Sequence, residues 1–260
     1  MNRLMIRLWG MLDGENSASI NYQIAKVLIE RMATIEHTST SALAELCNVL
    51  KPSISRFVKD LGYEDFYDFR AELNHYNPDR GIKFFQGKDE EVGHYAEHYL
   101  DNVMQKISLL KQEDVSRKML QIAEDIMKYR KVYVMGNMQS GTTASNLHYN
   151  LHVIKENIEA VTSLNEQKQV LEHLKAGELA IIFSVSGEYF HAFYSENDIP
   201  VPPLNAKIWM VTTNPAIQKV TGVDELLNCR TGESLAGANI ILELVANQIA
   251  INCWQDNTSK

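Results

Sequence analysis

A short apolar run that ends in serines and a glycine constrains this chain more than any other feature. Residues 180–183 are apolar, and Ser184, Ser186 and Gly187 follow them. A run of this length is too short for a helix and is typical of a buried parallel strand. In open α/β sheets, ligands bind at the carboxyl ends of strands, where hydroxyls and backbone amides suit a phosphate. The stretch therefore predicts a strand that opens onto a binding loop.

The same pattern occurs once earlier in the chain. Residues 131–135 are mostly apolar and end at Gly136, and Asn137, Gln139 and Ser140 precede a helical pattern. Each turn by itself can equally be an ordinary helix cap, because Ser, Thr and Gly favour such positions for local reasons. Two such turns within one α/β pattern indicate a single shared crevice.

The second half of the chain alternates between strand and helix patterns. We expect further strands near residues 158–161 and 207–212, a helix over 164–174 and a final helix over about 235–251. Two long helices, over about 90–110 and 115–126, precede the first strand, and the prolines within 195–205 predict an irregular loop. This alternation predicts an α/β, doubly wound parallel sheet.

The first half has a purely helical pattern. Apolar spacing predicts helices over residues 19–34, 42–47 and 51–61, with Thr40 or Ser41 as the cap of the second. A tight turn at 48–50 separates the last two helices. Three short helices with this spacing predict an all-α helix-turn-helix bundle.

The third of these helices concentrates positive charge in an acidic neighbourhood. In a recognition helix, Lys, Arg and Ser side chains contact phosphates or base edges. The same residues can instead form the solvated face of a small bundle, with Arg56 paired to a nearby carboxylate. The residues expected to bind DNA are Lys51, Ser53, Ser55, Arg56 and Lys59.

Composition limits the class of protein. The 260 residues carry a formal net charge of −8, which argues against broad polyanion binding but permits a local basic surface. Three cysteines without metal-ligand spacing favour a reducing compartment, and neither a signal peptide nor a membrane span is expected. We therefore expect a cytoplasmic protein with no cofactor and no metal.

One family resemblance covers the helical part. The run from Leu43 to Tyr63, with Ser53-Ile54-Ser55-Arg56-Phe57 at its centre and a Phe-x-x-Phe after it, resembles the helix-turn-helix domain of the RpiR family. The resemblance implies a bacterial transcriptional regulator of sugar metabolism. Leu50 departs from the pattern, because the family usually has a Ser there. Losing that cap costs about 1 kcal/mol of helix stability, which Pro52 partly offsets.

The resemblance extends to the second half. In RpiR-like regulators this half is a sugar isomerase (SIS) domain, and residues 107–254 are similar in layout. Met138 stands where a second glycine is usual and Tyr189 where Thr or Ser is usual, so we expect larger side chains to narrow the crevice. The implied sugar-phosphate ligand residues are Gly136, Asn137, Gln139, Ser140, Ser184, Ser186, Gly187 and Glu188, although Glu188 can equally face solvent.

These observations predict a DNA-binding regulator whose α/β domain binds a phosphorylated sugar and holds a homodimer or homotetramer together. The expected organisation is a DNA-binding domain at 1–78, a linker and connecting helix at 79–106, and a SIS-like domain at 107–260. We expect no enzyme activity. Two alternatives remain open: a sugar-phosphate isomerase with a helical extension, and a regulator with a degenerate effector site. An isomerase needs a positioned base, and the histidines near these elements are His148, His152, His173 and His191.

Overall fold

The computed structural model describes residues 3–14, 16–32, 35, 38–74, 95–194, 198–230 and 236–258. The chain divides into two compact units, residues 1–82 and 83–260. The domain boundary expected between residues 78 and 79 lies outside the described residues, as do the first residues of the helix expected over 90–110. Each unit is described by itself.

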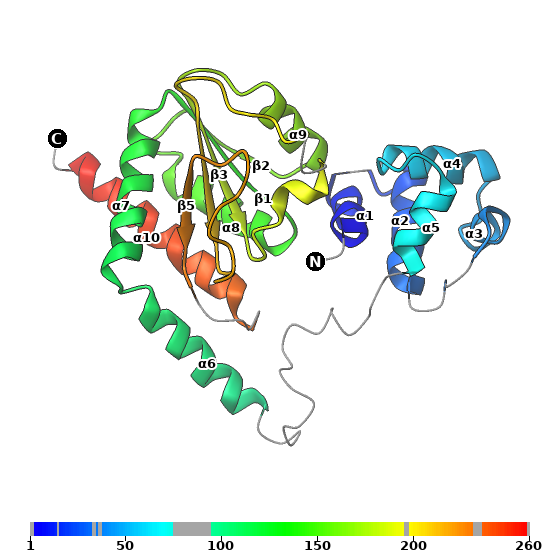
Figure 1. The fold of residues 1–260 in the computed structure, drawn as a ribbon, viewed down its shortest axis with the longest axis horizontal. Helices are drawn as coiled ribbons and strands as arrows, with labels where there is room; N and C mark the ends of the chain where they lie inside the picture. Colours follow the sequence, from blue (N-terminus) through cyan, green and yellow to red (C-terminus); the bar gives the residue numbers. More distant parts are fainter. Residues whose placement is uncertain are drawn as a thin grey trace. The chain divides into compact units, whose positions relative to one another are not determined.

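The first unit is a bundle of short helices (Figure 1). They are α1 (Arg3–Gly14), α2 (Ile20–Arg31), α3 (Thr40–Leu46), α4 (Lys51–Asp60) and α5 (Phe66–Asn74). The three predicted helices correspond to α2, α3 and α4. The predicted cap of α3 was wrong: Ser39 Oγ accepts a hydrogen bond from the Ala42 amide at 3.2 Å, because Ser39 is the last extended residue before the helix. Between α3 and α4, Asn48 takes a positive φ of 52° in the tight turn.

Helix α1 was not predicted as a helix from the sequence. Its buried Leu4 and Leu8 belong to the same apolar core as Leu28 and Phe57. A polar contact also holds it, because the Leu4 amide donates to Glu72 Oε1 at 2.9 Å. This carboxylate on α5 is therefore one of the groups that fix α1 to the bundle.

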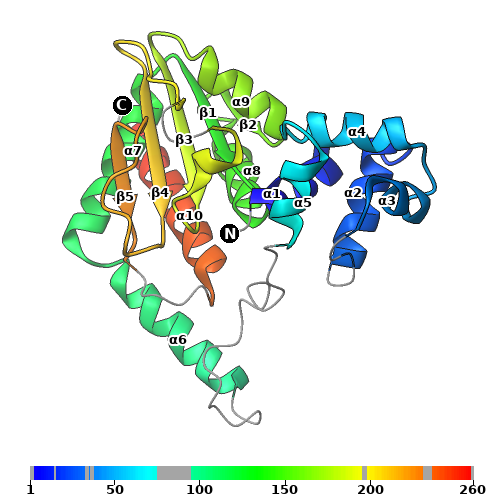
Figure 2. The ribbon, with the colours of Figure 1, turned by 45° about the vertical axis from the view of Figure 1, so that its right-hand side comes forward.

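The second unit contains a five-stranded parallel sheet (Figure 2). Helices α6 (Tyr95–Leu109) and α7 (Glu113–Lys128) precede it. The elements that follow are β1 (Lys131–Gly136), α8 (Gln139–Leu151), β2 (Ile158–Val161), α9 (Leu164–Glu172), β3 (Glu178–Ser184), the 3₁₀ turn η4 (Tyr189–Ala192), β4 (Lys207–Thr212), β5 (Glu225–Asn228) and α10 (Ala238–Thr258). The strand order is β2-β1-β3-β4-β5, as expected for a doubly wound sheet.

Alternate residues of each strand face two separate apolar clusters. Val134, Phe183 and Trp209 pack with α7, α8 and α10 on one face of the sheet. Met135 and Ile182 pack with α9 and η4 on the other face. Both faces are therefore covered, which explains why β3 is buried along its whole length and reads as a continuous apolar run.

Strand β5, the turn after β3 and the end of α10 differ from, or add to, the sequence prediction, whereas the proline-containing loop agrees with it. Strand β5 was not predicted, because it spans only four residues and only Leu227 among them is buried. The serine turn leads into the single 3₁₀ turn η4 rather than a full helix, and the described residues 198–206 form the irregular loop that the prolines predict. Helix α10 extends to Thr258, beyond its expected end.

The described part of the chain bears on the expectations about membrane spans and cysteines. No helix among the described residues is long and apolar enough to cross a membrane. Cys47, Cys229 and Cys253 are buried free thiols. Burial raises the pKa of Cys229 to about 12 and that of Cys47 to about 11, so both thiols are protonated at neutral pH.

Candidate functional site

Helix α4 presents the predicted DNA-binding residues on its outer side. Lys51, Ser55, Arg56 and Lys59 are exposed and Ser53 is half-buried. The opposite side of the helix carries the buried residues Ile54, Phe57 and Val58, which fix its orientation on the bundle.

The cations of α4 are available to an external partner. Lys51, Arg56 and Lys59 form no ion pair with any carboxylate among the described residues, so internal pairing does not use their charge. Pro52 stands in the first turn, and the N-cap residue Leu50 makes no side-chain cap hydrogen bond. A helix with this arrangement can contact phosphates and base edges.

The two serine-containing turns lie side by side at the carboxyl edge of the sheet. Strands β1 and β3 are neighbours, and Gly136 pairs in register with Phe183. The chain continues from β1 to β2 on one side and from β3 to β4 on the other, so the order of the strands reverses between them. Ligands of open α/β sheets bind at such a switch point. The structure thus brings the predicted residues 136–140 and 184–188 to one place.

The turn after β1 is closely packed and leaves polar atoms without partners. A Cβ at Gly136 would lie 2.5 Å from the Ser140 carbonyl oxygen, so only glycine fits. Asn137 Oδ1 is buried and accepts no hydrogen bond within the described part of the chain. Ser140 is 6% exposed, and its hydroxyl likewise has no partner among the residues described. An acceptor and a hydroxyl are therefore left for a bound molecule.

The turn after β3 uses its serines as local caps. Ser184 Oγ accepts from the Gly187 amide at 3.1 Å, and Ser186 Oγ accepts from the Glu188 amide at 3.3 Å. Gly187 has a φ of 76° and packs against Ile217. Glu188 is exposed. Each serine hydroxyl still has its own hydrogen to donate, so local capping and ligand binding are compatible.

Tyr189 does not narrow the crevice, and that expectation was wrong. Its side chain is 2% exposed and lies among Met135, Phe190 and Phe193 on the α9 face of the sheet. Burial raises the pKa of the phenol well above its usual value, so it is protonated and donates to Gln167 Oε1 at 2.8 Å. The ring lies inward in the apolar cluster, where its hydroxyl finds an acceptor in Gln167.

Gln167 is a residue that sequence reasoning missed. It is fully buried on α9, one turn before the buried Leu171. A polar residue on the apolar face of the predicted helix was the available signal, since buried amides require hydrogen-bond partners. Met138, which was expected to narrow the crevice, has a φ of 55° and a ψ of −125°, a conformation that glycine adopts most readily. Whether its side chain narrows the crevice stays a prediction.

The histidines near these elements do not form a metal centre. His152 Nδ1 and His173 Nδ1 lie within hydrogen-bond distance of the backbone carbonyls of Tyr149 and Gln169. His148 lies beside His152, with ring centroids 6.2 Å apart, and His191 is exposed. The described residues contain no group of three or more His, Cys, Asp or Glu side chains that could hold a metal ion.

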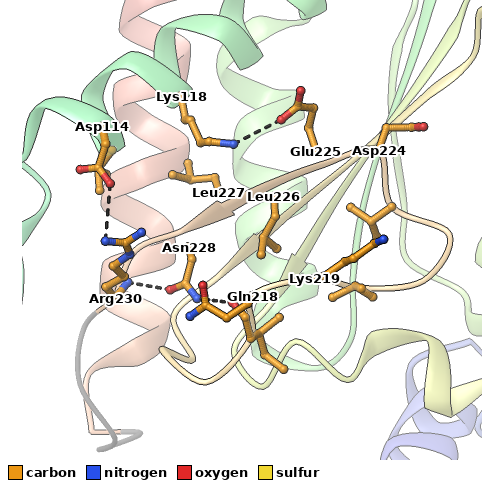
Figure 3. Close-up of a pocket in the computed structure, with 14 residues that line it drawn as sticks. Asp114, Lys118, Gln218, Lys219, Asp224, Glu225, Leu226, Leu227, Asn228 and Arg230 are labelled. Carbon is orange, nitrogen blue, oxygen red and sulfur yellow. Dashed lines mark hydrogen bonds and ion pairs between the residues drawn. The ribbon is translucent and has the colours of Figure 1, made fainter.

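A cavity of about 350 Å³ lies beside β5 and does not include the predicted ligand residues (Figure 3). Its charged lining is largely paired: Lys118 contacts Glu225 at 3.2 Å, and Arg230 contacts Asp114 at 3.8 Å. These cations are already compensated by carboxylates. The cavity therefore attracts an anion less strongly than its number of basic residues suggests.

Several known proteins are similar to this chain. Residues 15–78 match the family model of the helix-turn-helix domain, rpiR family. The HTH-type transcriptional regulator GlvR of Bacillus subtilis is 25% identical over 170 residues, which are 65% of this chain and 61% of that protein. The chain thus spans about three-fifths of the length of this curated relative.

Solved structures with similar coordinates are more distant in sequence. The Vibrio vulnificus NanR protein, complexed with ManNAc-6P, is 17% identical with a TM-score of 0.48 and matches 98% of this chain and 93% of its own. The sugar isomerase domain of an RpiR transcription factor from Sphaerobacter thermophilus is 17% identical with a TM-score of 0.46 and matches 63% of this chain and 89% of its own. Phosphoheptose isomerase GmhA from Neisseria gonorrhoeae is 18% identical with a TM-score of 0.47, over 62% of this chain and 96% of its own.

Proposed function

Because residues 15–78 of this chain are a helix-turn-helix domain of the rpiR family, we propose that the protein is a transcriptional regulator that binds operator DNA and a phosphorylated sugar. The observation that carries the proposal is the pairing of this domain with a separate α/β unit whose two polar turns meet at the switch point of its sheet. The first unit supplies DNA binding and the second supplies the response to a metabolite.

Helix α4 is the recognition helix in this proposal. Lys51 and Lys59 contact backbone phosphates, while Ser53, Ser55 and Arg56 lie where base edges in the major groove come within reach. The protein acts as a homodimer or homotetramer, because two-fold symmetry presents paired recognition helices to a palindromic operator.

The sugar phosphate lies over the carboxyl ends of β1 and β3. The hydroxyls of Ser140, Ser184 and Ser186 donate to the phosphate, and Asn137 Oδ1 accepts from a sugar hydroxyl. Its buried oxygen without a partner supports this assignment, because an unpaired buried acceptor costs about 1–3 kcal/mol until a donor arrives. The ligand residues proposed here include no Lys or Arg, so neutral donors hold the phosphate.

The test uses the full-length protein with two variants. DNA sequences are selected from a random library, and affinity is measured by fluorescence anisotropy; thermal shift is measured with N-acetylmannosamine 6-phosphate, glucose 6-phosphate and ribose 5-phosphate. Arg56→Ala is expected to lower DNA affinity about 5- to 150-fold, because a bidentate base contact is worth about 1–3 kcal/mol. Ser140→Ala is expected to remove the thermal shift and leave DNA affinity unchanged.

Four results would contradict this function. The regulator is excluded if wild-type protein selects no DNA sequence or if Arg56→Ala binds the selected DNA as tightly as wild type. The effector site is excluded if no sugar phosphate raises the melting temperature, since selective binding to the folded state must raise it. Isomerisation of any of the three sugar phosphates, lost in Ser140→Ala, would favour an enzyme instead.

A further inference from the structure

One buried amide joins the ends of three neighbouring strands. Gln167 lies on α9 and is 0% exposed. Its Nε2 donates to the Gly136 carbonyl at the end of β1, at 3.0 Å, and to the Val161 carbonyl at the end of β2, at 2.9 Å. Its Oε1 accepts from the Tyr189 hydroxyl, which follows β3, at 2.8 Å. The side chains of Gln167 and Tyr189 thus connect the turn after β1 to the turn after β3.

The polar character of this connection calls for an explanation. An apolar pair would fill the same space, and burying a polar group is costly unless it is hydrogen-bonded. Apolar packing is non-directional, whereas hydrogen bonds fix both distance and direction. A fully satisfied buried network therefore rigidifies the groups that it joins.

The site needs rigid spacing between these two turns. Hydroxyls and amides act over short distances, so neutral donors on separate turns must be held within about 0.5 Å of their productive positions. Gly136, whose carbonyl Gln167 holds, lies directly against Ser140, because a Cβ on Gly136 would meet the Ser140 carbonyl oxygen. Tyr189 follows Glu188 at the other turn.

We propose that Gln167 and Tyr189 are positioning residues, which hold the turns at 136–140 and 184–188 at the separation that lets both contact one sugar phosphate. This inference rests on the proposed function of the same site. Neither residue touches the ligand; both act through the backbone of the turns that do.

The test removes one oxygen. Tyr189→Phe keeps the ring in its aromatic cluster and deletes the hydrogen bond to Gln167. In the full-length protein at 25 °C, titration calorimetry with N-acetylmannosamine 6-phosphate and glucose 6-phosphate is expected to show affinity falling about 3- to 10-fold. Hydrogen exchange of the ligand-free protein is expected to quicken in peptides covering residues 136–141 and 184–189.

Tyr194→Phe is the matched control. Tyr194 belongs to the same apolar cluster, but its hydroxyl donates to the Lys168 carbonyl at 3.5 Å, away from the strand ends. We expect this variant to change neither affinity nor exchange in the two turns. A loss of packing alone would lower the melting temperature of both variants and leave affinity at 25 °C unaltered.

The outcomes separate this inference from the function on which it rests. Unchanged affinity and exchange in Tyr189→Phe, or an equal effect of Tyr194→Phe, overturns the positioning role. If wild-type protein binds neither sugar phosphate, the proposed ligand is wrong. Hydrogen exchange alone then decides whether Gln167 and Tyr189 hold the two turns together. Faster exchange in both turns of Tyr189→Phe supports the positioning role, and a change confined to residues 189–192 overturns it.

Discussion

Two residues of this chain stand where their side chains are locally unfavourable. Met138 has a φ of 55° and a ψ of −125° at the start of α8, and Leu50 is 76% exposed at the N-cap of α4. Both positions lie in segments to which we assign binding. Residues that are unfavourable for their backbone conformation or cap position occur most often at functional sites, where stability is not the only requirement.

Met138→Gly is expected to stabilise the second unit by about 1 kcal/mol. The backbone strain of a non-glycine residue in this conformation costs about 1–3 kcal/mol, and the greater freedom of glycine in the unfolded chain offsets part of the gain. Urea unfolding followed by the fluorescence of buried Trp209 measures the change.

The matched control is Met138→Ala, which removes the long side chain but keeps the Cβ. If the alanine variant is as stable as the glycine variant, backbone strain is not the cause. A glycine variant less stable than wild type would show that Met138 contributes packing that outweighs its strain.

At the scale of elements, α4 begins without the cap that helix N-termini usually have. Pro52 presets the first turn, but the side chain of the N-cap residue Leu50 accepts no hydrogen bond from the free amides there. Helices α2 and α3 each have a serine cap, Ser19 and Ser39. Helix α4, which is proposed to contact DNA, therefore has a weaker N-terminal cap than α2 and α3.

Leu50→Ser is expected to raise the free energy of unfolding of the first unit by about 1 kcal/mol. The serine hydroxyl can accept from an amide of the first turn, as Ser39 does in α3. Thermal unfolding followed by circular dichroism measures the change. Leu50→Ala removes the exposed apolar side chain without adding an acceptor, so a gain of the same size in this variant would refute the capping explanation.

At the scale of the molecule, an acidic chain carries its proposed DNA contacts on one helix. The formal net charge is −8, yet α4 offers Lys51, Arg56 and Lys59 to a partner. Long-range repulsion disfavours indiscriminate DNA binding and leaves recognition to a small cationic surface. In the proposed function, the sugar phosphate controls DNA affinity through a coupling free energy between two separate sites.

That coupling is expected to change operator affinity about 5- to 150-fold when the sugar phosphate binds, which corresponds to about 1–3 kcal/mol. Anisotropy titrations of selected DNA with and without saturating sugar phosphate measure it. By linkage, DNA must change the affinity for the sugar phosphate by the same factor. Ser140→Ala should keep basal DNA affinity and lose the response. A response that persists in this variant would place the effector elsewhere.

The sequence by itself determined the alternation of strands and helices, the position of α4 and the meeting of two polar turns. These features depend on local periodicity and on a continuous apolar run such as that of β3, which any buried parallel strand produces. Met138 and Leu50 were visible as departures from the family pattern that the chain resembles, at a turn and a cap whose conformations favour particular residue types.

Only the tertiary structure decided what depends on distant contacts. Helix α1 is fixed partly by Glu72 on α5, and β5 is a strand because it pairs with β4. Tyr189 turns inward because Gln167, 22 residues earlier, offers it an acceptor within the core. Such partners lie far apart in the chain, and local sequence patterns carry no information about which of them meet.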